Sequence, residues 1–357
     1  MLITQRSARK GDDMAVRTFT TETELDDALT TPGDALVDDL RQGSGDIVIL
    51  GAGGKMGPSL ARLARAGLDA AGRDGDRVVA VSRFSDPRHR EELERHGITV
   101  MPFDLVEHDD LSVLPDAPNV IHMVGAKFGA DRNQSWAWEV NAALPGRIAR
   151  RYRDSRIVAM STGNVYPFVS PATGGATEDT PPDPVGEYAQ SCLGRERVFQ
   201  FAAATWGTAL SVIRLNYAVD LRYGVLADLA TQIMADQPVP LHTGSVNIVW
   251  QGYANEVILR SLGHADAEVF TLNLTGTELL EVRRIATRLA DLLGHQVHFD
   301  GEPEPTALLS DATRCRELFG PSPVDADQLI EWQAAWVRDG LPMTAKPTKW
   351  AVRDGKF

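Results

Sequence analysis

Three glycines stand three residues apart at Gly51, Gly54 and Gly57, a spacing that could bring backbone N–H groups against a phosphate. A short apolar segment of strand type (46–51) leads into them, and an Ala/Leu/Arg helix pattern (58–70) follows at once. This order suits a tight turn, close approach to a pyrophosphate and a helix N-terminus that favours negative charge. An ordinary strand-to-helix turn is the alternative, but the flanking elements favour a bound dinucleotide, NAD or NADP. The predicted loop residues are Gly51, Gly54, Lys55, Met56 and Gly57.

The end of the next strand bears on which coenzyme this loop would hold. Ser82 and Arg83 stand where NAD-specific proteins usually place a carboxylate for the ribose 2′-hydroxyl. An acid would repel the 2′-phosphate of NADP, whereas Arg83, with Arg88 as a second candidate, could bind it. A solvated strand-end residue is the alternative for Arg83. We therefore expect NADP in preference to NAD.

Two further strand ends offer contacts to the adenine and the ribose. A third apolar segment runs into Asp104 and Leu105, where a carboxylate can accept a hydrogen bond from the adenine amino group. An ordinary loop aspartate is the alternative. A fourth segment ends in Val124 and Gly125, whose small size leaves room for a ribose against the backbone. His122 lies in the apolar part of this segment, so we interpret it as a core histidine with its hydrogen bonds satisfied.

From residue 46 onwards, apolar strands alternate with helical patterns, which favours a parallel sheet covered on both faces. The expected strands are 46–51, 77–82, 98–102, 118–124, 156–161 and 209–214. The expected helices are 57–70, 87–96, 134–152 and 186–206. Beyond residue 219 the alternation breaks down into helices near 224–235, 253–262 and 279–293 with strands at 246–250 and 268–273. We predict an α/β fold, a doubly wound parallel sheet of Rossmann type with a smaller C-terminal α/β substrate-binding lobe.

The predicted domain boundaries follow from this pattern. Residues 1–45 are expected to be an N-terminal extension with short acidic helices, one opened by a capping box at Thr21–Glu24, lying as an appendage on the surface. Met14 is a candidate for the true start. The remaining segments are a coenzyme-binding domain (46–218), a mainly substrate-binding lobe (219–345) whose strand–helix unit 246–262 returns to the first domain, and a C-terminal tail (346–357).

The composition excludes several classes of protein. The chain has 357 residues, 43% of them hydrophobic and 24% charged, as in ordinary globular proteins. A net charge of −13 disfavours nucleic acid or an anionic membrane as partner. The sequence has no apolar run of about 20 residues and no secretory signal. Two cysteines suggest no disulfide framework. We expect a cytoplasmic protein with a small-molecule substrate.

Several further motifs, taken together, resemble the extended short-chain dehydrogenase/reductase superfamily, in its NAD(P)-dependent epimerase/dehydratase branch. The resemblance covers about residues 46–340. Lys127 is similar to a lysine that follows the fourth strand in UDP-galactose 4-epimerases, and Asn141 matches the asparagine of the next helix. The other matching motifs are the glycine loop, Val120-Ile-His-Met-Val-Gly125, Ser161-Thr-Gly-Asn-Val-Tyr166, Tyr188 with Arg195-Glu196, Arg214-Leu-Asn216 and the segment Leu308–Gly320.

The resemblance implies that Tyr188 transfers a proton while Thr162, with Ser161 beside it, holds the substrate oxygen. In this superfamily a lysine four residues after the tyrosine binds the nicotinamide ribose, and its charge lowers the tyrosine pKa from about 10. Cys192 occupies that position here, one helical turn after Tyr188 and on the same face. A loss of two pKa units of activation would lower the phenolate population about a hundredfold.

Three explanations of Cys192 remain open. Lys127 or Arg195 could supply the charge from elsewhere, since Arg195 shares the helix face of Tyr188 and no lysine occurs between Lys127 and Lys346. Alternatively, another group could transfer the proton while Tyr188 only binds, or the site could be degenerate and bind coenzyme without turnover. We expect Cys192 to be a small helix residue packed beside the coenzyme rather than a nucleophile.

The resemblance implies an oxidoreductase or epimerase that acts on a secondary alcohol or ketone of a carbohydrate-like molecule. A coenzyme-binding regulatory or scaffold protein is the alternative. A homodimer through helices 134–152 and 186–206 is a further implication. We expect no metal site, because His295, His298 and Asp300 are typical of a surface cluster. The tryptophans expected to pack between helices are Trp136, Trp138, Trp332 and Trp336.

Overall fold

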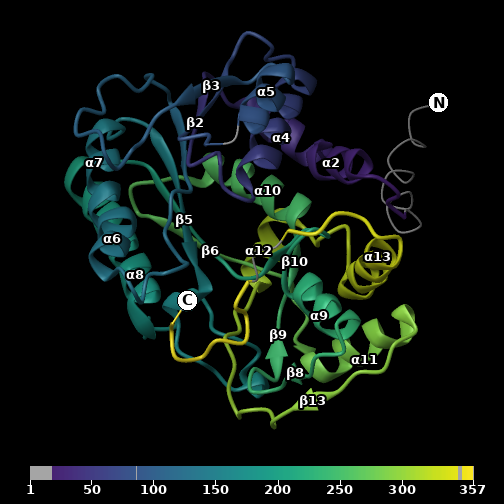
Figure 1. Ribbon diagram of the computed structural model, residues 1–357. Helices are drawn as coiled ribbons and strands as arrows, with labels where there is room; N and C mark the ends of the chain where they lie inside the picture. Colours follow the sequence, from purple (N-terminus) through teal and green to yellow (C-terminus); the bar gives the residue numbers. More distant parts are fainter. Residues whose placement is uncertain (1–17, 86, 345–347, 357) are drawn as a thin grey trace, which may run out of the picture.

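A parallel sheet of seven strands forms the centre of the computed structural model, which describes residues 18–85, 87–344 and 348–356 (Figure 1). The strands follow the order β11-β6-β5-β4-β1-β2-β3, and every neighbouring pair is parallel. Their bounds are β1 Ile47–Leu50, β2 Val78–Ser82, β3 Thr99–Pro102, β4 Asn119–His122, β5 Arg156–Thr162, β6 Leu210–Leu215 and β11 Phe270–Leu274. The predicted α/β fold with a doubly wound parallel sheet is therefore confirmed. The strand order reverses between β1 and β4, which in such sheets places a crevice at the carboxyl ends of these two strands.

Both faces of the sheet are buried, and this explains why β1 is apolar throughout. Ile47 and Ile49 contribute to the core on one face, whereas Val48 and Leu50 contribute to the core on the other. Successive side chains of a strand point to opposite faces, so a strand covered on both sides has no position for a polar residue.

Helices cover the two faces in separate layers (Figure 1). On one face α10 packs against α4, and α5 lies beside α4; on the other, α8 packs against α7 and the turn before it. The bounds are α4 Gly57–Ala70, α5 Pro87–Arg95, α6 Gln134–Trp138, η1 Glu139–Ala143, α7 Leu144–Arg151, α8 Gly186–Trp206 and α10 Gln251–Arg260. The single helix expected over 134–152 is interrupted by η1, a π-helical segment that contains the buried Asn141. Such segments often occur at functional sites, because they change the direction in which a side chain points.

The N-terminal extension is not the surface appendage that the sequence suggested. Its helices α2 (Glu22–Thr30) and α3 (Asp34–Gln42) pack against α4 and α10. The leucines on their inner faces are 0–6% exposed: Leu25, Leu29, Leu36 and Leu40. The predicted capping box is half present, since the Thr21 side chain accepts a hydrogen bond from the Glu24 N–H, while the Glu24 carboxylate accepts one from Thr20. The apolar face of each short helix therefore adds to the main core. Met14 lies outside the described residues.

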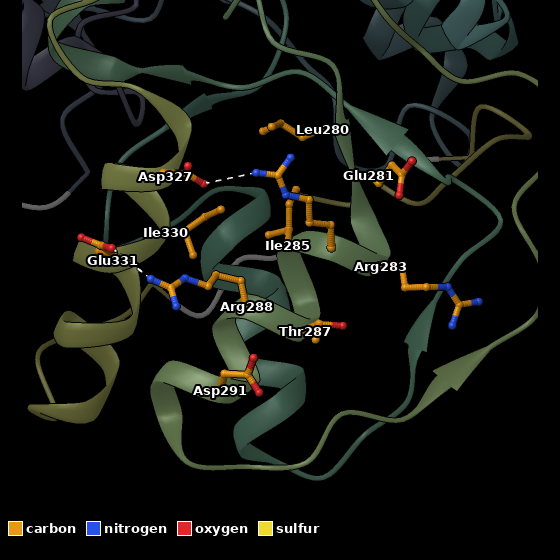
Figure 2. Close-up of a pocket in the computed structure, with 11 residues that line it drawn as sticks. Leu280, Glu281, Arg283, Ile285, Thr287, Arg288, Asp291, Asp327, Ile330 and Glu331 are labelled. Carbon is orange, nitrogen blue, oxygen red and sulfur yellow. Dashed lines mark hydrogen bonds and ion pairs between the residues drawn. The ribbon is translucent and has the colours of Figure 1, made fainter.

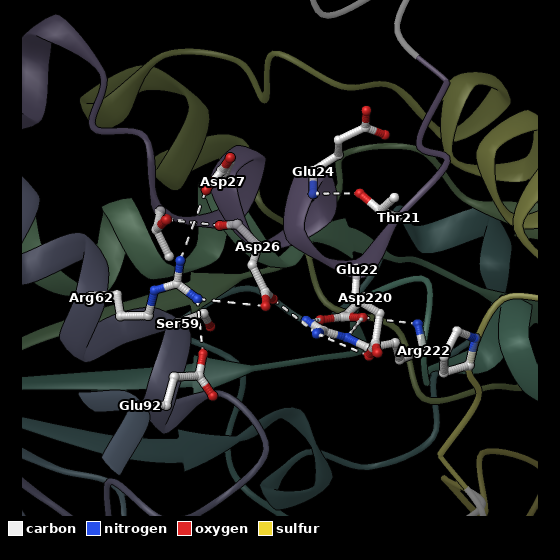
Figure 3. Close-up of polar contacts among 12 residues, drawn as sticks. Thr21, Glu22, Glu24, Asp26, Asp27, Ser59, Arg62, Glu92, Asp220 and Arg222 are labelled. Atoms are coloured by element: carbon white, nitrogen blue, oxygen red, sulfur yellow. Dashed lines mark hydrogen bonds and ion pairs between the residues drawn. The ribbon is translucent and has the colours of Figure 1, made fainter. Parts of the chain in front are cut away.

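Ion pairs link α2 to both parts of the molecule (Figure 3). The Asp26 carboxylate lies 3.5 Å from Nη1 of Arg62 on α4 and 2.8 Å from Nη1 of Arg222, which lies just before α9. Arg62 also pairs with Glu92 of α5, and Arg222 pairs with Asp220. Both guanidinium groups are largely buried, so salt screens these pairs less than it screens surface ion pairs. The extension therefore connects the sheet domain to the second lobe.

The second lobe is built from helices and two-stranded ladders. Its helices are α9 Val225–Met234, α11 Val282–Leu293 and α13 Ala326–Arg338, which pack on one another, and α12 Thr313–Phe319 lies against β11. The ladders pair β7 Ala218–Val219 with β10 Val249–Trp250, β8 Val239–Pro240 with β13 Phe299–Asp300, and β9 Ser245–Val246 with β12 Leu280–Glu281.

The chain crosses between the two parts more than once. The strand expected over 246–250 is split into β9 and β10, which pair outside the central sheet, whereas the helix after it, α10, packs on α4. β11 adds the edge strand beside β6, although it lies within the segment expected to form the lobe. Among the described residues, no helix has the length and apolar character needed to cross a membrane.

Candidate functional site

The glycine-rich loop between β1 and α4 has the shape that a dinucleotide requires. Gly51 has φ +90°, and a Cβ there would lie 2.8 Å from the Val124 nitrogen. A Cβ on Gly57 would lie 2.1 Å from the Ala52 carbonyl oxygen, so this glycine permits close packing of α4 on the strand end. A Cβ on Gly54 would meet only the Gly51 carbonyl oxygen of its own loop, at 3.4 Å. The Gly54 backbone is therefore open to a phosphate, and α4 begins three residues later.

A cleft of about 390 Å³ lies beside this loop, at the carboxyl ends of β1, β2, β3 and β4. It brings together most of the coenzyme-binding residues predicted from the sequence: Gly51, Gly54, Ser82, Arg83, Asp104, Leu105, Val124, Gly125 and Lys127. Lys55, Met56 and Gly57 belong to the loop and the start of α4 but do not line the cleft. The sequence analysis missed other lining residues, Gly53, Phe103, Val106, Met123, Ala126, Phe128, Trp136 and Val140. All of these except Trp136 stand next to a predicted residue in the chain, and that position was the available signal. The residues present fit a dinucleotide.

Arg83 and Asp104 lie together at this cleft. The Arg83 side chain is 71% exposed, and its Nε lies 3.9 Å from Oδ2 of Asp104. Oδ1 of Asp104 accepts hydrogen bonds from the backbone N–H groups of Val106 (2.9 Å) and Glu107 (3.2 Å). One carboxylate oxygen therefore holds the loop after β3, while the exposed guanidinium remains able to approach an anion in the cleft.

Asn141 and Arg195 are buried residues that form hydrogen bonds next to the cleft. The Asn141 side-chain oxygen accepts hydrogen bonds from the Ala126 N–H (2.9 Å) and from Arg195 Nη2 (2.7 Å). Arg195 Nη1 also donates to the Met160 carbonyl oxygen at 2.7 Å. A Cβ on Gly125 would lie 3.0 Å from Arg195 Nη2, so the chain passes close to this guanidinium. Arg195 is thus a buried cation fixed by neutral groups beneath the cleft.

Tyr188, Thr162 and Cys192 lie in contact, as the sequence predicted for the first two. The Tyr188 hydroxyl is buried and forms hydrogen bonds with both the Thr162 hydroxyl and the Cys192 thiol. Burial raises the pKa of Tyr188, and a negative charge on Cys192 would raise it further, whereas the Arg195 charge lowers it. Burial also raises the pKa of the Cys192 thiol. The pair is therefore neutral near pH 7, and the thiol gives the phenol no cationic support.

Lys127 approaches the same tyrosine from the end of β4. Its Nζ lies 5.7 Å from the centroid of the Tyr188 ring and donates a hydrogen bond to the Thr348 carbonyl oxygen at 3.3 Å. Burial lowers the pKa of Lys127 to about 8. The ammonium group is mostly charged at neutral pH and loses its proton as the pH rises through 8. Of the two cations that the sequence proposed, Lys127 lies over the tyrosine ring, whereas Arg195 is the one whose charge lowers the pKa of Tyr188.

Ser161, next to Thr162, points into a buried ion-pair network instead. Its hydroxyl donates to Glu196 Oε1 at 2.5 Å, and the Glu196 carboxylate also accepts two hydrogen bonds from Arg214, at 3.0 and 2.8 Å. Arg214 Nη1 donates to the Tyr166 hydroxyl at 2.7 Å. Asn216 is similarly buried, with its amide donating to Asn247 and to the Leu308 carbonyl oxygen. Ser161 and Asn216, both predicted as site residues, therefore hold the ends of β5 and β6 in place.

Other sequence expectations change in the structure. His122 is fully buried, as expected, but neither ring nitrogen has a hydrogen-bond partner in the described part of the chain, and burial lowers its pKa. Trp332 and Trp336 are buried, whereas Trp136 and Trp138 are 41% and 40% exposed. The Trp138 ring still packs between helices as predicted, since a Cβ on Gly194 of α8 would lie 3.3 Å from it. Trp136 and Trp138 both lie on α6, and Trp138 Nε1 donates to Glu187. Across residues 18–85, 87–344 and 348–356, no group of three His, Cys, Asp or Glu side chains could hold a metal ion.

A larger groove lies away from the glycine loop, between α11 and α13 (Figure 2). It measures about 610 Å³, and ion pairs bridge it from Arg284 to Asp327 and from Arg288 to Glu331. None of the residues predicted to act in catalysis or coenzyme binding lines it. The ion pairs that bridge it are exposed, which is typical of two helices packed at a surface.

Comparisons with known proteins support the fold. No protein-family model and no curated protein sequence matches the chain. Solved structures do: a UDP-glucuronic acid 4-epimerase variant from Bacillus cereus with NAD has a TM-score of 0.68 at 17% identity, covering 82% of this chain and 99% of that one. A UDP-glucose 4-epimerase from Thermotoga maritima has a TM-score of 0.67 at 16% identity (83% and 99% covered), and MoeE5 with UDP-glucose and NAD has 0.66 at 18% (83% and 99%). The predicted likeness in fold to the extended short-chain dehydrogenases/reductases is confirmed.

The buried ion pair between Glu196 and Arg214 gives a stability prediction. Replacing Arg214→Met leaves the Glu196 carboxylate buried without its cation, which should cost about 3–5 kcal/mol of unfolding free energy. Urea unfolding followed by circular dichroism measures this loss. Arg197→Met is the matched control, because Arg197 lies on the exposed side of α8, the helix that carries Glu196. It should change the free energy of unfolding by about 0.5 kcal/mol or less. Equal losses in the two variants would contradict a supporting role for the network.

Proposed function

We propose that the protein is an NAD(P)-dependent enzyme that moves a hydride at a secondary alcohol or ketone of a carbohydrate-like small molecule. The observation that carries this proposal is the position of Tyr188, hydrogen-bonded to Thr162 and contacted by the Lys127 ammonium group, close to a cleft shaped for a dinucleotide. The structural neighbours with NAD and UDP-sugars support a nucleotide sugar as the first substrate class to test.

Different residues of the chain would bind the coenzyme and transfer the proton of the substrate. The nicotinamide coenzyme, when bound, supplies the group that accepts or donates hydride. The glycine loop and α4 would hold its phosphates, and Lys127 would hold the ribose and the charge beside it. Tyr188 would give or take the proton at the substrate oxygen, while Thr162 fixes that oxygen by a hydrogen bond. In this arrangement Lys127 would supply, from the end of β4, the positive charge that a lysine at the position of Cys192 on α8 supplies in the superfamily.

A second candidate function is a coenzyme-binding regulatory or scaffold protein without turnover. The specific observation in its favour is the neutral Cys192 thiol hydrogen-bonded to a phenol whose pKa is raised by burial. Under this hypothesis Cys192→Lys would restore the missing cation and create activity. Under the first hypothesis Cys192→Lys brings a second cation close to Lys127 and gives no gain.

The first hypothesis predicts that Tyr188→Phe lowers turnover about a hundredfold or more without weakening coenzyme binding, because only the proton-transfer group is removed. Turnover on a panel of UDP-sugars and free sugars, followed by coenzyme absorbance and product chromatography, measures the effect. The wild-type rate should also fall as the pH rises through about 8, where Lys127 loses its charge. Lys127→Met should be slow at every pH.

Lys127→Arg is the control for this pH dependence, because it keeps a positive charge across the range and should abolish the fall near pH 8. Full activity in Tyr188→Phe would remove the proposed role of the tyrosine. Coenzyme binding without turnover on any member of the panel, with activity gained in Cys192→Lys, would favour the regulatory protein.

We further propose a preference for NADP, on the strength of Arg83. Its exposed guanidinium lines the cleft beside Ser82, where the 2′-phosphate of the adenosine ribose would lie. Arg83→Ala should weaken NADPH binding about tenfold and leave NADH binding unchanged, because a charge-assisted hydrogen bond to phosphate is lost. Titration calorimetry with both coenzymes measures this. Arg90→Ala, an exposed arginine on α5, is the control. Equal affinity of the wild-type protein for both coenzymes would contradict the preference.

A homodimer through α6, α7 and α8 is also proposed. Exposed aromatic side chains on two of these helices support it, namely Trp138, Phe201 (60% exposed) and Trp206. Phe201→Asp should convert a dimer into a monomer in light scattering at micromolar concentration, because a charge would be buried at an apolar interface. Val113→Asp, at another exposed apolar residue, should leave the mass unchanged. A wild-type monomer would rule the dimer out.

A further inference from the structure

The last described residues, 348–356, cross the space between the two parts of the molecule, and we call them the C-terminal strap. At the start of the strap, Thr348 contacts both α9 of the lobe and Lys127, which follows β4. Its N–H and its hydroxyl donate to Asp228 Oδ2 on α9, at 2.8 and 2.5 Å, and its carbonyl oxygen accepts from Lys127 Nζ at 3.3 Å. The strap thus begins in contact with the lysine that lies against Tyr188.

The middle of the strap is held by a buried aromatic side chain and by its own carbonyl groups. Trp350 is 4% exposed and packs into the main core. Its carbonyl oxygen accepts from the Tyr217 hydroxyl at 3.3 Å, and that of Ala351 accepts from Thr243 at 3.4 Å. Tyr217 lies two residues after β6, at the carboxyl edge of the sheet, and Thr243 belongs to the lobe.

The far end of the strap reaches the start of the helix that carries Tyr188. Arg353 donates to the carbonyl oxygen and the hydroxyl of Thr306, at 2.7 and 2.9 Å, and its guanidinium lies 4.3 Å from the centroid of the Phe168 ring. Gly355 then lies on Gly186: a Cβ on Gly186 would be 2.7 Å from the Gly355 Cα. Figure 1 shows the strap in yellow, ending beside α8.

These contacts place the strap near Tyr188, on the side of the second lobe. It touches Lys127 at one end and Gly186, two residues before Tyr188, at the other. No residue of the strap lines the cleft beside the glycine loop. The strap therefore lies outside the glycine-loop cleft, between Lys127 and the second lobe.

The strap is an irregular segment. It forms no helix or strand, and apart from Trp350 and Ala351, which pack on the main core, it is held by individual hydrogen bonds. Lys349 has φ +56°, a left-handed conformation that is unfavourable for a non-glycine residue. The flanking contacts at Thr348 and Trp350 hold this conformation in the closed state, and release of the strap would relieve it.

We propose that the C-terminal strap occupies the substrate side of the crevice and competes with a nucleotide-sugar substrate, so that binding of one releases the other. This proposal rests on the proposed function for its choice of competing ligand. No strap residue lines the glycine-loop cleft, so a coenzyme in that cleft would meet the strap only through the shared contact with Lys127.

The test compares Arg353→Ala, which frees the far end of the strap, with wild type and with Lys356→Ala, whose ion pair with Asp354 stays within the strap. Titration calorimetry with UDP-glucose should show about tenfold tighter binding in Arg353→Ala and no change in Lys356→Ala. NADPH affinity should be equal in all three. Thr348→Val, which loosens the first end, should also bind UDP-glucose more tightly.

Hydrogen exchange of the intact protein locates the effect. Saturating UDP-glucose should increase exchange at the amides of residues 348–356. Unchanged UDP-glucose affinity in both loosened variants, protection of the strap by UDP-glucose, or absence of UDP-glucose binding in every variant would each overturn the proposal. NADPH binding in the same samples separates these outcomes from failure of the proposed function, which would be shown by absence of coenzyme binding.

Discussion

The buried ion pair between Glu196 and Arg214 is the interaction on which the geometry of the site depends. It joins α8 to β6, and through the Ser161 hydroxyl it also fixes the end of β5. Burying two charges is costly unless every polar atom has a partner, and here Ser161 and the Tyr166 hydroxyl supply the further hydrogen bonds. The position of α8 relative to β5 is consequently narrowly defined. That relation brings Tyr188 of the helix against Thr162 of the strand.

The distribution of positive charge around Tyr188 then follows from which elements converge there. From α8, Cys192 brings a neutral thiol to Tyr188; the end of β4 brings Lys127 to the tyrosine ring, and Arg195 is bonded to the Met160 carbonyl oxygen nearby. Arg195 is held by the Met160 carbonyl oxygen and Asn141, so its role is to fix the cleft as well as to contribute charge. Lys127 is the more adaptable of the two cations, because burial brings its pKa into a range where it can gain or lose a proton.

The two ends of the chain add a second layer of constraint. Near the N-terminus, Asp26 of α2 pairs with Arg62 of the sheet domain and with Arg222 before α9. At the other end, the strap connects α9 to the start of α8. Both segments connect the same two parts of the molecule. The first does so with two short helices packed into the core, whereas the second does so with an irregular segment.

The sequence by itself determined six of the seven strands of the sheet, most of the helices and the loop that begins at Gly51, because apolar periodicity and glycine spacing are local properties of the chain. It assigned the edge strand β11 to the lobe. It also placed Thr162 and Tyr188 correctly at the ends of β5 and α8. It could not show that Ser161 turns to Glu196, that α2 and α3 are packed rather than appended, or that Trp136 and Trp138 are half exposed. Those facts, like the contact of Lys127 with Tyr188 and the path of the strap, were decided by the tertiary structure, since each depends on residues far apart in the chain that meet only when the whole fold is assembled.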